Sequence, residues 1–257
     1  MNAPASRHAL LSWATVAVIL LAWWTVTALG LGARFALPSP GDLARELAVL
    51  ATQGYAQQPL STHVLASLRR TLVGLGAGLA VGIPLGLSMG MSRTMFSVLA
   101  PVFTFLRPIP PIAFIPLMIL YFGIGEFSKV FLIFMAALSY VVLHAVAGVR
   151  SVPQDLLSAG RNLGLTRAKL FRHVVFPAAL PHIMTGVKTA TAISWAIVVA
   201  AELIAAQAGL GFMVMDATTF FRVPDVYIGI LIIGLIGLTL EAVTRAIERS
   251  LLHWQGR

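Results

Sequence analysis

The chain has 257 residues, of which 58% are hydrophobic and only 11% are charged, and its formal net charge at pH 7 is +9. With a mean hydropathy of +0.90, this composition excludes an ordinary soluble domain and indicates an integral membrane protein. The sequence contains no cysteine, which excludes disulfides and thiolate metal sites.

Polar or charged stretches separate six apolar segments, at about 9–32, 68–91, 98–122, 130–149, 183–206 and 226–243. Each segment has the roughly 18 residues or more that suffice for a membrane-spanning helix. We therefore predict an all-α integral membrane protein with six transmembrane helices. The first segment is longer than the apolar core of a secretory signal, so we expect it to be retained.

The second segment has a glycine at every fourth position: Gly74, Gly78, Gly82, Gly86 and Gly90. Small residues at this spacing let helices approach closely, because helix association in lipid depends on packing. Each step of four residues advances about 40° around the axis, so we expect the stripe to wind and to serve successive neighbours. The alternative is ordinary membrane glycine, which does not predict five in one register.

The third segment is interrupted by five prolines: Pro101, Pro108, Pro110, Pro111 and Pro116. A continuous helix cannot include such a run, and broken backbone at membrane depth is tolerated only inside protein or beside a water-filled cavity. We therefore predict that Arg107, Pro108, Pro110 and Pro111 line a translocation path. In the alternative, Arg107 lies nearer the cytoplasmic surface and has a structural role, binding carbonyl groups that the break leaves free.

The fifth segment carries two charged residues, Lys188 and Glu202. They lie about 21 Å apart along a helix axis, so they cannot pair within the helix. We expect Lys188 to reach the inner interface and Glu202 to lie near the outer end. The alternative is that Glu202 is a gate or interface residue of the translocation path.

The distribution of Lys and Arg predicts the orientation in the membrane. With the N-terminus inside, ten lie in inner segments and six in outer segments. The inner ones are Arg7, Arg93, Arg150, Arg161, Arg167, Lys169, Arg172, Arg245, Arg249 and Arg257, and the outer ones are Arg34, Arg45, Arg69, Arg70, Lys129 and Arg222. This bias places both termini and the loop at 150–181 in the cytoplasm, so much of the charge reflects topology rather than nucleic-acid binding.

The loop at 150–181 is both amphipathic and densely charged. Ser151 can cap a first helix that has Pro153 in its first turn, and Gly164 can end that helix in a left-handed conformation. Thr166 can cap a second helix, which we expect to end at Pro177 because proline lacks the next donor. The loop is therefore predicted to contain two short helices.

One face of the first helix is apolar and flat, with Leu156, Gly160 and Leu163 at helical spacing and Ala159 beside them. Such a face lets another protein surface approach closely. An ordinary basic loop between two membrane helices is the alternative on spacing alone. A DNA-binding helix-turn-helix is excluded, because apolar segments of membrane length flank the loop on both sides.

The residues Ser158-Ala159-Gly160, Gly164, Val174, Phe176 and Pro177 resemble the "EAA" coupling loop of permease subunits in binding-protein-dependent ABC importers. In that family the loop docks on an ATPase subunit. The resemblance implies an ATPase-coupling role for Ser158, Ala159, Gly160, Leu163, Gly164, Phe176 and Pro177. The sequence departs from the family pattern at Ser158, which replaces the usual Glu, at Gly160, which replaces the second Ala, and at Phe176, which replaces a Leu.

Three further stretches, at 106–133, 176–190 and 200–220, are similar to permeases of the nitrate/sulfonate/taurine importer family. The phrases AAELIAA and GLGFMV and the HWQG ending look most like taurine-transporter permeases. The resemblance implies a type I ABC importer permease fold, with an N-terminal helix and outer amphipathic segment at 1–64 and a permease core at 65–257. It also implies a bacterial inner-membrane homodimer with two cytoplasmic ATPase subunits and a periplasmic binding protein.

The function expected from this resemblance is the import of taurine or a related small sulfonate. The sequence has no phosphate-binding G-x-x-x-x-G-K-[ST] loop, so ATP must bind elsewhere and neither catalytic residues nor a cofactor nor a metal is expected here. The alternatives within the class are nitrate, an aliphatic sulfonate or an aromatic acid. A proton-coupled transporter would need titratable groups near the midplane, an enzyme would need clustered His and carboxylates, and a channel would not need the docking loop.

Overall fold

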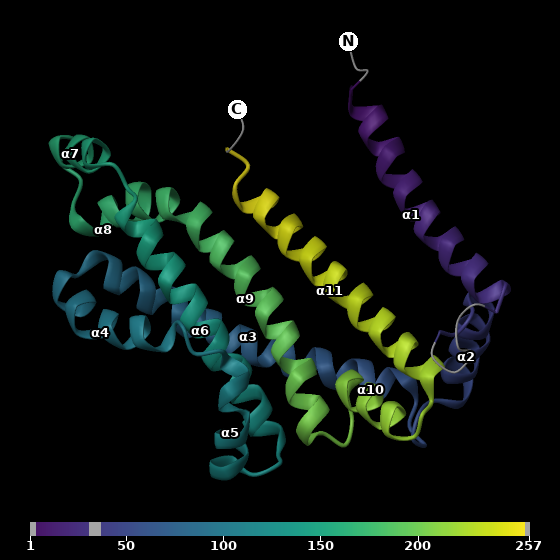
Figure 1. Ribbon diagram of the computed structural model, residues 1–257. Helices are drawn as coiled ribbons and strands as arrows, with labels where there is room; N and C mark the ends of the chain where they lie inside the picture. The colour runs from purple at the N-terminus through teal and green to yellow at the C-terminus, as the bar shows by residue number, and fades with distance from the viewer. Residues whose placement is uncertain (1–3, 31–36, 255–257) are drawn as a thin grey trace. The chain divides into compact units, whose positions relative to one another are not determined.

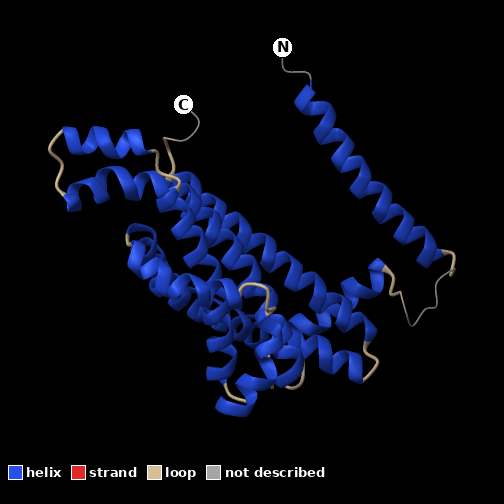
Figure 2. Cartoon of the chain, turned by 60° about the vertical axis from the view of Figure 1, so that its left-hand side comes forward, coloured by secondary structure: helices blue, strands red, loops and turns tan. Residues whose placement is uncertain are grey.

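The computed structural model describes residues 4–30 and 37–254. Over these ranges the chain consists of helices joined by short loops (Figure 2). The one β-bridge among the described residues pairs Tyr55 with Gln58. Two compact units form: a smaller unit of Met1–Thr62 with Met213–Leu231, and a larger unit of His63–Phe212 with Ile232–Arg257. Arg34 and Arg257, which entered the charge count, lie outside the described residues.

Eleven α-helices are labelled in chain order over the described residues (Figure 1). They are α1 (Pro4–Ala28), α2 (Pro40–Gln53), α3 (Leu60–Met91), α4 (Arg93–Leu106), α5 (Ile115–Phe122), α6 (Glu126–Arg150), α7 (Gln154–Asn162), α8 (Arg167–Leu170), α9 (Phe176–Ala205), α10 (Leu210–Thr219) and α11 (Val223–Leu251). A 3₁₀ turn at Pro111–Phe114 leads into α5, and a π turn at Phe171–Val175 joins α8 to α9.

Within the described ranges, four helical stretches are long and apolar enough to cross a bilayer: α3, α6, α11 and the continuous stretch Arg167–Ile204. The pair Arg93–Leu106 and Pro111–Phe122 meets the same criterion as one span bent by 87°. A shorter apolar stretch, Trp13–Ala28, lies in α1. The all-helical membrane class is therefore confirmed, with four or five spans by length and composition.

The predicted break in the third apolar segment is confirmed. α4 ends at Leu106, and the helix resumes only with the 3₁₀ turn that begins at Pro111. The break falls here because Pro108, Pro110 and Pro111 lack the N–H groups that a continuing helix would use. A single proline is tolerated, since Pro101 lies inside α4.

The glycine stripe of α3 packs against α6. A Cβ atom added to Gly78 would lie 2.6 Å from the Cβ of Ala137, and one added to Gly86 would lie 2.6 Å from that of Ala145. The other three stripe positions also face α6 side chains, with Gly74 against Ile133, Gly82 against Val141 and Gly90 against Val149. The expectation of successive neighbours is wrong, because the contacts on α6 also advance four residues at a time and the two rows wind together.

On its other side, α6 packs closely against α9. A Cβ at Gly148 of α6 would lie 2.8 Å from the Ala179 carbonyl oxygen, and one at Gly186 of α9 would lie 2.6 Å from the Cβ of His144. Glycines therefore let α6 approach both neighbours, α3 and α9. These three helices form the framework on which the loop at 150–181 and the broken third segment are held.

Candidate functional site

The loop at 150–181 folds as α7 and α8 with a tight turn between them. Gly164 in that turn has a φ of +74°, and the Thr166 hydroxyl accepts a hydrogen bond of 3.4 Å from the Lys169 N–H at the start of α8. The predicted left-handed glycine and the predicted cap are both confirmed. These two local signals fix where α7 ends and where α8 begins.

The predicted start of α7 is wrong by two residues. Ser151 does not cap the helix, because its hydroxyl donates to the Gly148 carbonyl at 2.9 Å and so continues the bonding of α6. The N-cap is Pro153, whose extended ψ of 138° turns the chain into α7. The Gly148 carbonyl on the preceding helix is therefore the acceptor that the Ser151 hydroxyl binds, in place of a capping contact at the start of α7.

The predicted end of the second helix at Pro177 is also wrong. The helix continues from Arg167 to Ile204, and Pro177 lies in the first turn of α9. The wider π turn accommodates it, because the N–H of Phe176 bonds to the Phe171 carbonyl five residues back. The second helix of the loop at 150–181 and the fifth apolar segment are thus one continuous element.

The predicted coupling residues divide into an exposed set and a packed set. Ser158 and Ala159 are exposed, and Leu163 at the end of α7 is 81% exposed although it is a large apolar side chain. Gly160 is buried, and a Cβ there would lie 2.6 Å from Leu170. Gly160 therefore lets α7 close onto α8, while its neighbours form the outward face.

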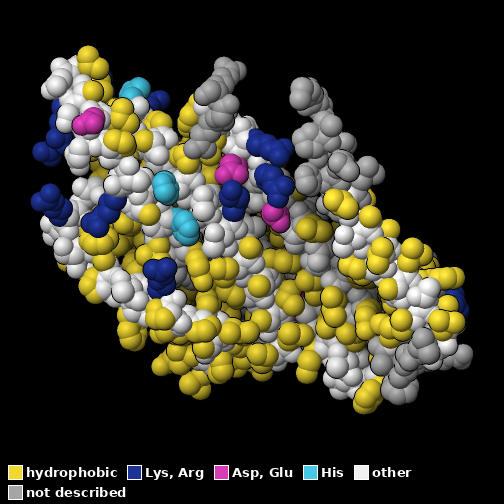
Figure 3. Space-filling model, turned by 45° about the horizontal axis from the view of Figure 1, so that its top comes forward, with side chains coloured by type: hydrophobic (Ala, Val, Ile, Leu, Met, Phe, Trp, Pro, Cys, Tyr) yellow, Lys and Arg dark blue, Asp and Glu magenta, His cyan; other side chains and the backbone are white. Residues whose placement is uncertain are grey.

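The two remaining predicted coupling residues, Phe176 and Pro177, are half-buried at the start of α9. The Phe176 ring lies against Phe171 of the π turn, with centroids 6.0 Å apart. In Figure 3 blue and cyan side chains gather at the left, over the part of the larger unit that contains α7 and α8 in Figure 1, and the surface below them is mostly yellow. The loop therefore presents a few apolar side chains within a basic surface.

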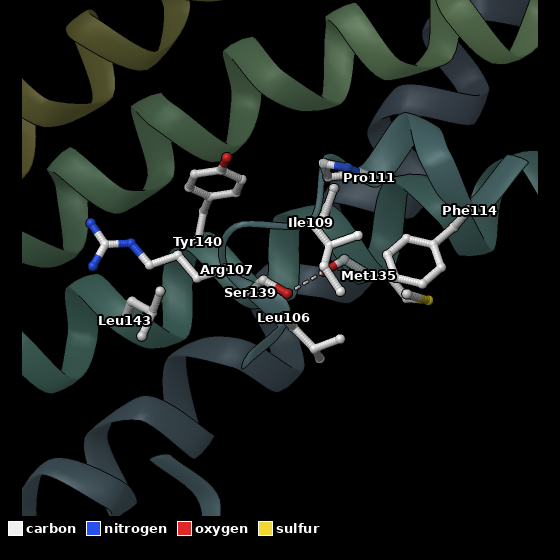
Figure 4. A pocket seen from close by; sticks show the side chains of 10 residues that line it. Leu106, Arg107, Ile109, Pro111, Phe114, Met135, Ser139, Tyr140 and Leu143 are labelled. Carbon is white, nitrogen blue, oxygen red and sulfur yellow. Dashed lines mark hydrogen bonds between the residues drawn. The ribbon is translucent and has the colours of Figure 1, made fainter. Parts of the chain in front are cut away.

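The break in the third segment opens a small pocket against the middle of α6 (Figure 4). Its lining includes Arg107, Pro111 and Phe114 from the break and Met135 and Tyr140 from α6. The cavity is about 40 Å³, which holds water but not a sulfonate-sized solute. Arg107 is exposed, and its guanidinium points away from Phe114 and Met135 in Figure 4.

Glu202 does not line this pocket. It is 1% exposed and lies in a buried ion cluster, where one carboxylate oxygen is 2.6 Å from a guanidinium nitrogen of Arg70. The Ser67 hydroxyl donates to the same carboxylate at 2.8 Å. The structure thus separates the predicted path residues into two places, the break and this cluster.

The sequence analysis counted Arg70 among the outer cations and did not predict its carboxylate partners. The Arg70 side chain is 4% exposed, and its guanidinium pairs with Glu126 as well as Glu202. A signal was available, because His63, Ser67 and Arg70 recur at helical spacing and mark a polar face on an apolar helix. All three are buried.

Lys188 also has a partner that the sequence analysis missed. Its ammonium group lies 2.8 Å from a carboxylate oxygen of Glu248 in α11. The side chain is partly exposed, so we expect this ion pair between α9 and α11 to contribute little to the free energy of unfolding.

A second polar cluster lies in the smaller unit. The hydroxyl of Tyr55 donates a hydrogen bond of 2.8 Å to Asp216, and Arg222 pairs with Glu46 and Asp225. The guanidinium of Arg222 also lies over the Tyr55 ring, 5.0 Å from its centroid. Burial raises the pKa of Tyr55 above its ordinary value, and the hydrogen bond to Asp216 raises it further.

A model of the family described as "Binding-protein-dependent transport system inner membrane component" matches residues 82–253. The chain is 43% identical to the taurine transport system permease protein TauC of Escherichia coli, over 98% of this chain and 92% of that protein. It is 35% identical to the putative aliphatic sulfonates transport permease protein SsuC of Escherichia coli, over 94% and 90%. It is 33% identical to the nitrate import permease protein NrtB of Synechocystis, over 91% and 86%.

Among solved structures, the fold is similar to a chain of the inward-facing MetNI methionine ABC transporter. The TM-score is 0.66 at 18% identity, and the match covers 75% of this chain and 95% of that one. At this identity the likeness concerns the arrangement of helices, and it covers nearly all of the solved chain.

Proposed function

The chain belongs to the family of binding-protein-dependent transport system inner membrane components, and on that premise we propose that it imports taurine or a related small sulfonate. It is the non-catalytic permease component of an ABC importer, and a system of this kind has ATPase and binding-protein partners. The observation that carries the proposed cargo is the 43% identity to a taurine permease over 98% of the chain. The exposed Arg107 beside the break suits an anionic solute.

The cargo can be tested in proteoliposomes that contain the permease, its ATPase subunits and its binding protein. We expect ATP-dependent uptake of labelled taurine, competed by short alkanesulfonates and not by nitrate. Uptake blocked by nitrate but not by sulfonates would instead favour the function of the nitrate relative. Uptake by the permease alone, without any ATPase, would contradict the importer itself.

We propose six spans with both termini in the cytoplasm. Two features support this count. α1 is 25 residues long, and the helices Arg93–Leu106 and Pro111–Phe122 are together long and apolar enough to form one bent span. In this arrangement residues 1–64 form an N-terminal helix with an outer amphipathic segment, and residues 65–257 form the permease core. The working assembly is a homodimer with two ATPase subunits and one periplasmic binding protein in the bacterial inner membrane.

We further propose that α7 and α8 are the surface that docks on the ATPase. Ser158, Ala159 and Leu163 supply the exposed face, and Gly160 and Gly164 set the shape of the loop. Phe176 and Pro177 join that shape to α9. Support comes from two large apolar side chains of this basic loop that are exposed, Leu156 and Leu163, because apolar surface rimmed by polar residues marks an interaction site.

Docking can be tested by co-purification of the ATPase with permease variants. We expect Ala159→Trp, which adds bulk to the exposed face, to lose the ATPase. Gly164→Val should also lose it, because a β-branched residue is strained at a φ of +74°. Gly164→Asn is the matched control, since asparagine tolerates this conformation; retention of the ATPase by Ala159→Trp would contradict the docking face.

For the translocation path, we propose that Arg107, Pro108, Pro110 and Pro111 lie beside the solute. Support comes from the pocket at the break, since irregular backbone at membrane depth is tolerated only inside protein or beside a water-filled cavity. Glu202 acts at the outer end of the path through the contacts that it makes inside the protein. ATP binding would draw the two coupling loops together and turn the cavity outward, and hydrolysis would reset it.

A further inference from the structure

The continuous helix from Arg167 to Ile204 connects the coupling loop with the ion cluster around Glu202. At 1.5 Å per residue, Glu202 lies about 40 Å along α9 from Phe176. Figure 1 shows α9 running from beside α8 to the opposite end of the larger unit. A movement imposed on α8 therefore reaches Glu202 along one helical stretch, through the π turn at Phe171–Val175 and past Pro181, without crossing a loop.

At that far end, Arg70 joins four segments of the chain. Its guanidinium donates to Glu202 of α9 at 2.6 Å, to the Ala208 carbonyl at 2.7 Å and to Glu126 of α6 at 2.8 Å. The side chain itself comes from α3, so α3, α6, α9 and the loop after α9 meet at one planar cation. A lysine has the same charge but cannot make this forked set of contacts.

The same cluster holds the start of α10. The N–H of Gly209 donates to Nδ1 of His63 at 3.2 Å, that of Leu210 to the Ser67 hydroxyl at 2.9 Å, and that of Gly211 to Glu202 at 3.0 Å. The first N–H groups of a helix have no partner within the helix. Here side chains of α3 and α9 supply those partners, so the start of α10 follows these two helices.

Gly209 and Gly211 are required because the backbone of this segment passes very close to Glu202 and Val199 of α9. A Cβ at Gly209 would collide with the Glu202 carboxylate, and one at Gly211 would lie 2.5 Å from the Val199 carbonyl oxygen. Gly209 also has a φ of +132°, a conformation that other residues rarely adopt. The segment AAELIAAQAGLG thus places the Glu202 carboxylate in direct contact with the backbone N–H of Gly211, whose hydrogen bond it accepts.

We propose that Arg70 and Glu202 are positioning residues that anchor the outer end of a lever formed by α9. The coupling loop moves the inner end, and the anchor makes α3, α6 and the start of α10 move with the outer end. Without the anchor, α9 would shift against its neighbours and the work of ATP hydrolysis would not reach the path. This inference rests on the proposed function, because the lever has a task only in an ATP-driven importer.

The test uses the assembled complex with its binding protein in proteoliposomes, and the measured quantity is solute imported per ATP hydrolysed. We expect Arg70→Gln and Glu202→Gln to lower this ratio about tenfold while ATP hydrolysis continues. Arg70→Lys should give an intermediate ratio, because one ammonium group cannot bridge both carboxylates. Arg69→Gln is the matched control and should match wild type. Arg69 is the adjacent cation, and its pair with Glu126 is long, at 3.5 Å, and its side chain is 72% exposed, so that the pair contributes little.

Ser67→Ala is the milder variant, since it removes the hydroxyl between Glu202 and Leu210 without leaving a charge buried and unpaired. We expect it to lower the ratio about threefold. A wild-type ratio in Arg70→Gln or Glu202→Gln overturns the proposal, and if neither variant assembles, a wild-type ratio in Ser67→Ala overturns it. Failure of the proposed function is a different result, namely wild-type import that does not require ATP.

Discussion

Tyr55 shows how a single buried side chain makes stability depend on pH. Its hydroxyl bonds Asp216, and its ring is buried at the turn that follows α2. Burial and this hydrogen bond raise the pKa of Tyr55 above its ordinary value, because both disfavour the phenolate. The folded protein therefore holds the phenolic proton more tightly than the unfolded chain does.

A group with a raised pKa in the folded state stabilises the fold fully below its unfolded pKa, which for tyrosine is about 10, and loses that contribution as the pH rises above it. We expect Tyr55→Phe to lower the free energy of unfolding by about 1 kcal/mol below pH 10. Above pH 10 its stability should decline less than that of wild type. Denaturant unfolding in detergent between pH 8 and 11 measures both effects.

Tyr121→Phe is the control for this prediction, because Tyr121 is 70% exposed. It should reproduce the wild-type curve throughout. Parallel curves for Tyr55→Phe and wild type up to pH 11 would show that Tyr55 is not held in its neutral form by the fold.

At the level of helices, the contact between α3 and α6 depends on the absence of side chains. The sequence spacing predicted the stripe, because a repeat of four residues is a local property of a helix. It did not identify α6 as the partner, since that depends on a matching row of contacts 59 residues further along the chain, from Gly74 against Ile133 to Gly90 against Val149. The same limit applies to the helix that continues through Pro177. The π turn that accommodates this proline is an arrangement of the backbone, and no residue type in the sequence indicates it.

Two alanine substitutions on α3 separate packing from helix propensity. Gly78→Ala places a methyl group 2.6 Å from Ala137, so we expect a loss of roughly 1–3 kcal/mol from overpacking. Gly76→Ala lies on the same helix with nothing within 4 Å, and we expect no loss and up to about 1 kcal/mol of gain. Equal effects of the two substitutions on thermal unfolding in detergent would contradict the close contact.

At the level of the whole molecule, composition alone predicted the helical membrane class, and the prolines at 108–111 predicted the break in the third segment. The ion cluster could not be predicted in the same way, because Arg70 and Glu202 are 132 residues apart. Their meeting requires α3, α6 and α9 to pack first. The count of cations assigned Arg70 only a side of the membrane, because such a count carries no information on the carboxylates that a cation contacts.

The orientation of the chain can be measured directly, because the sequence contains no cysteine and a single introduced thiol reports on one position. We expect Leu163→Cys, in the turn after α7, to react with a membrane-impermeant maleimide only from the cytoplasmic side. Ile124→Cys, in the exposed turn between α5 and α6, should react only from the outside. Labelling of Leu163→Cys from outside would reverse the proposed topology.

The π turn between α8 and α9 has one further consequence. It contains one residue more than an α-helical turn would, so the residues before it are offset by about 100° in helical phase from the residues after it. The apolar stripe by which α9 packs in the membrane therefore does not continue along α8. A one-residue deletion within 171–175 would remove the offset, and α8 would then present a different side to the proposed ATPase partner while remaining helical.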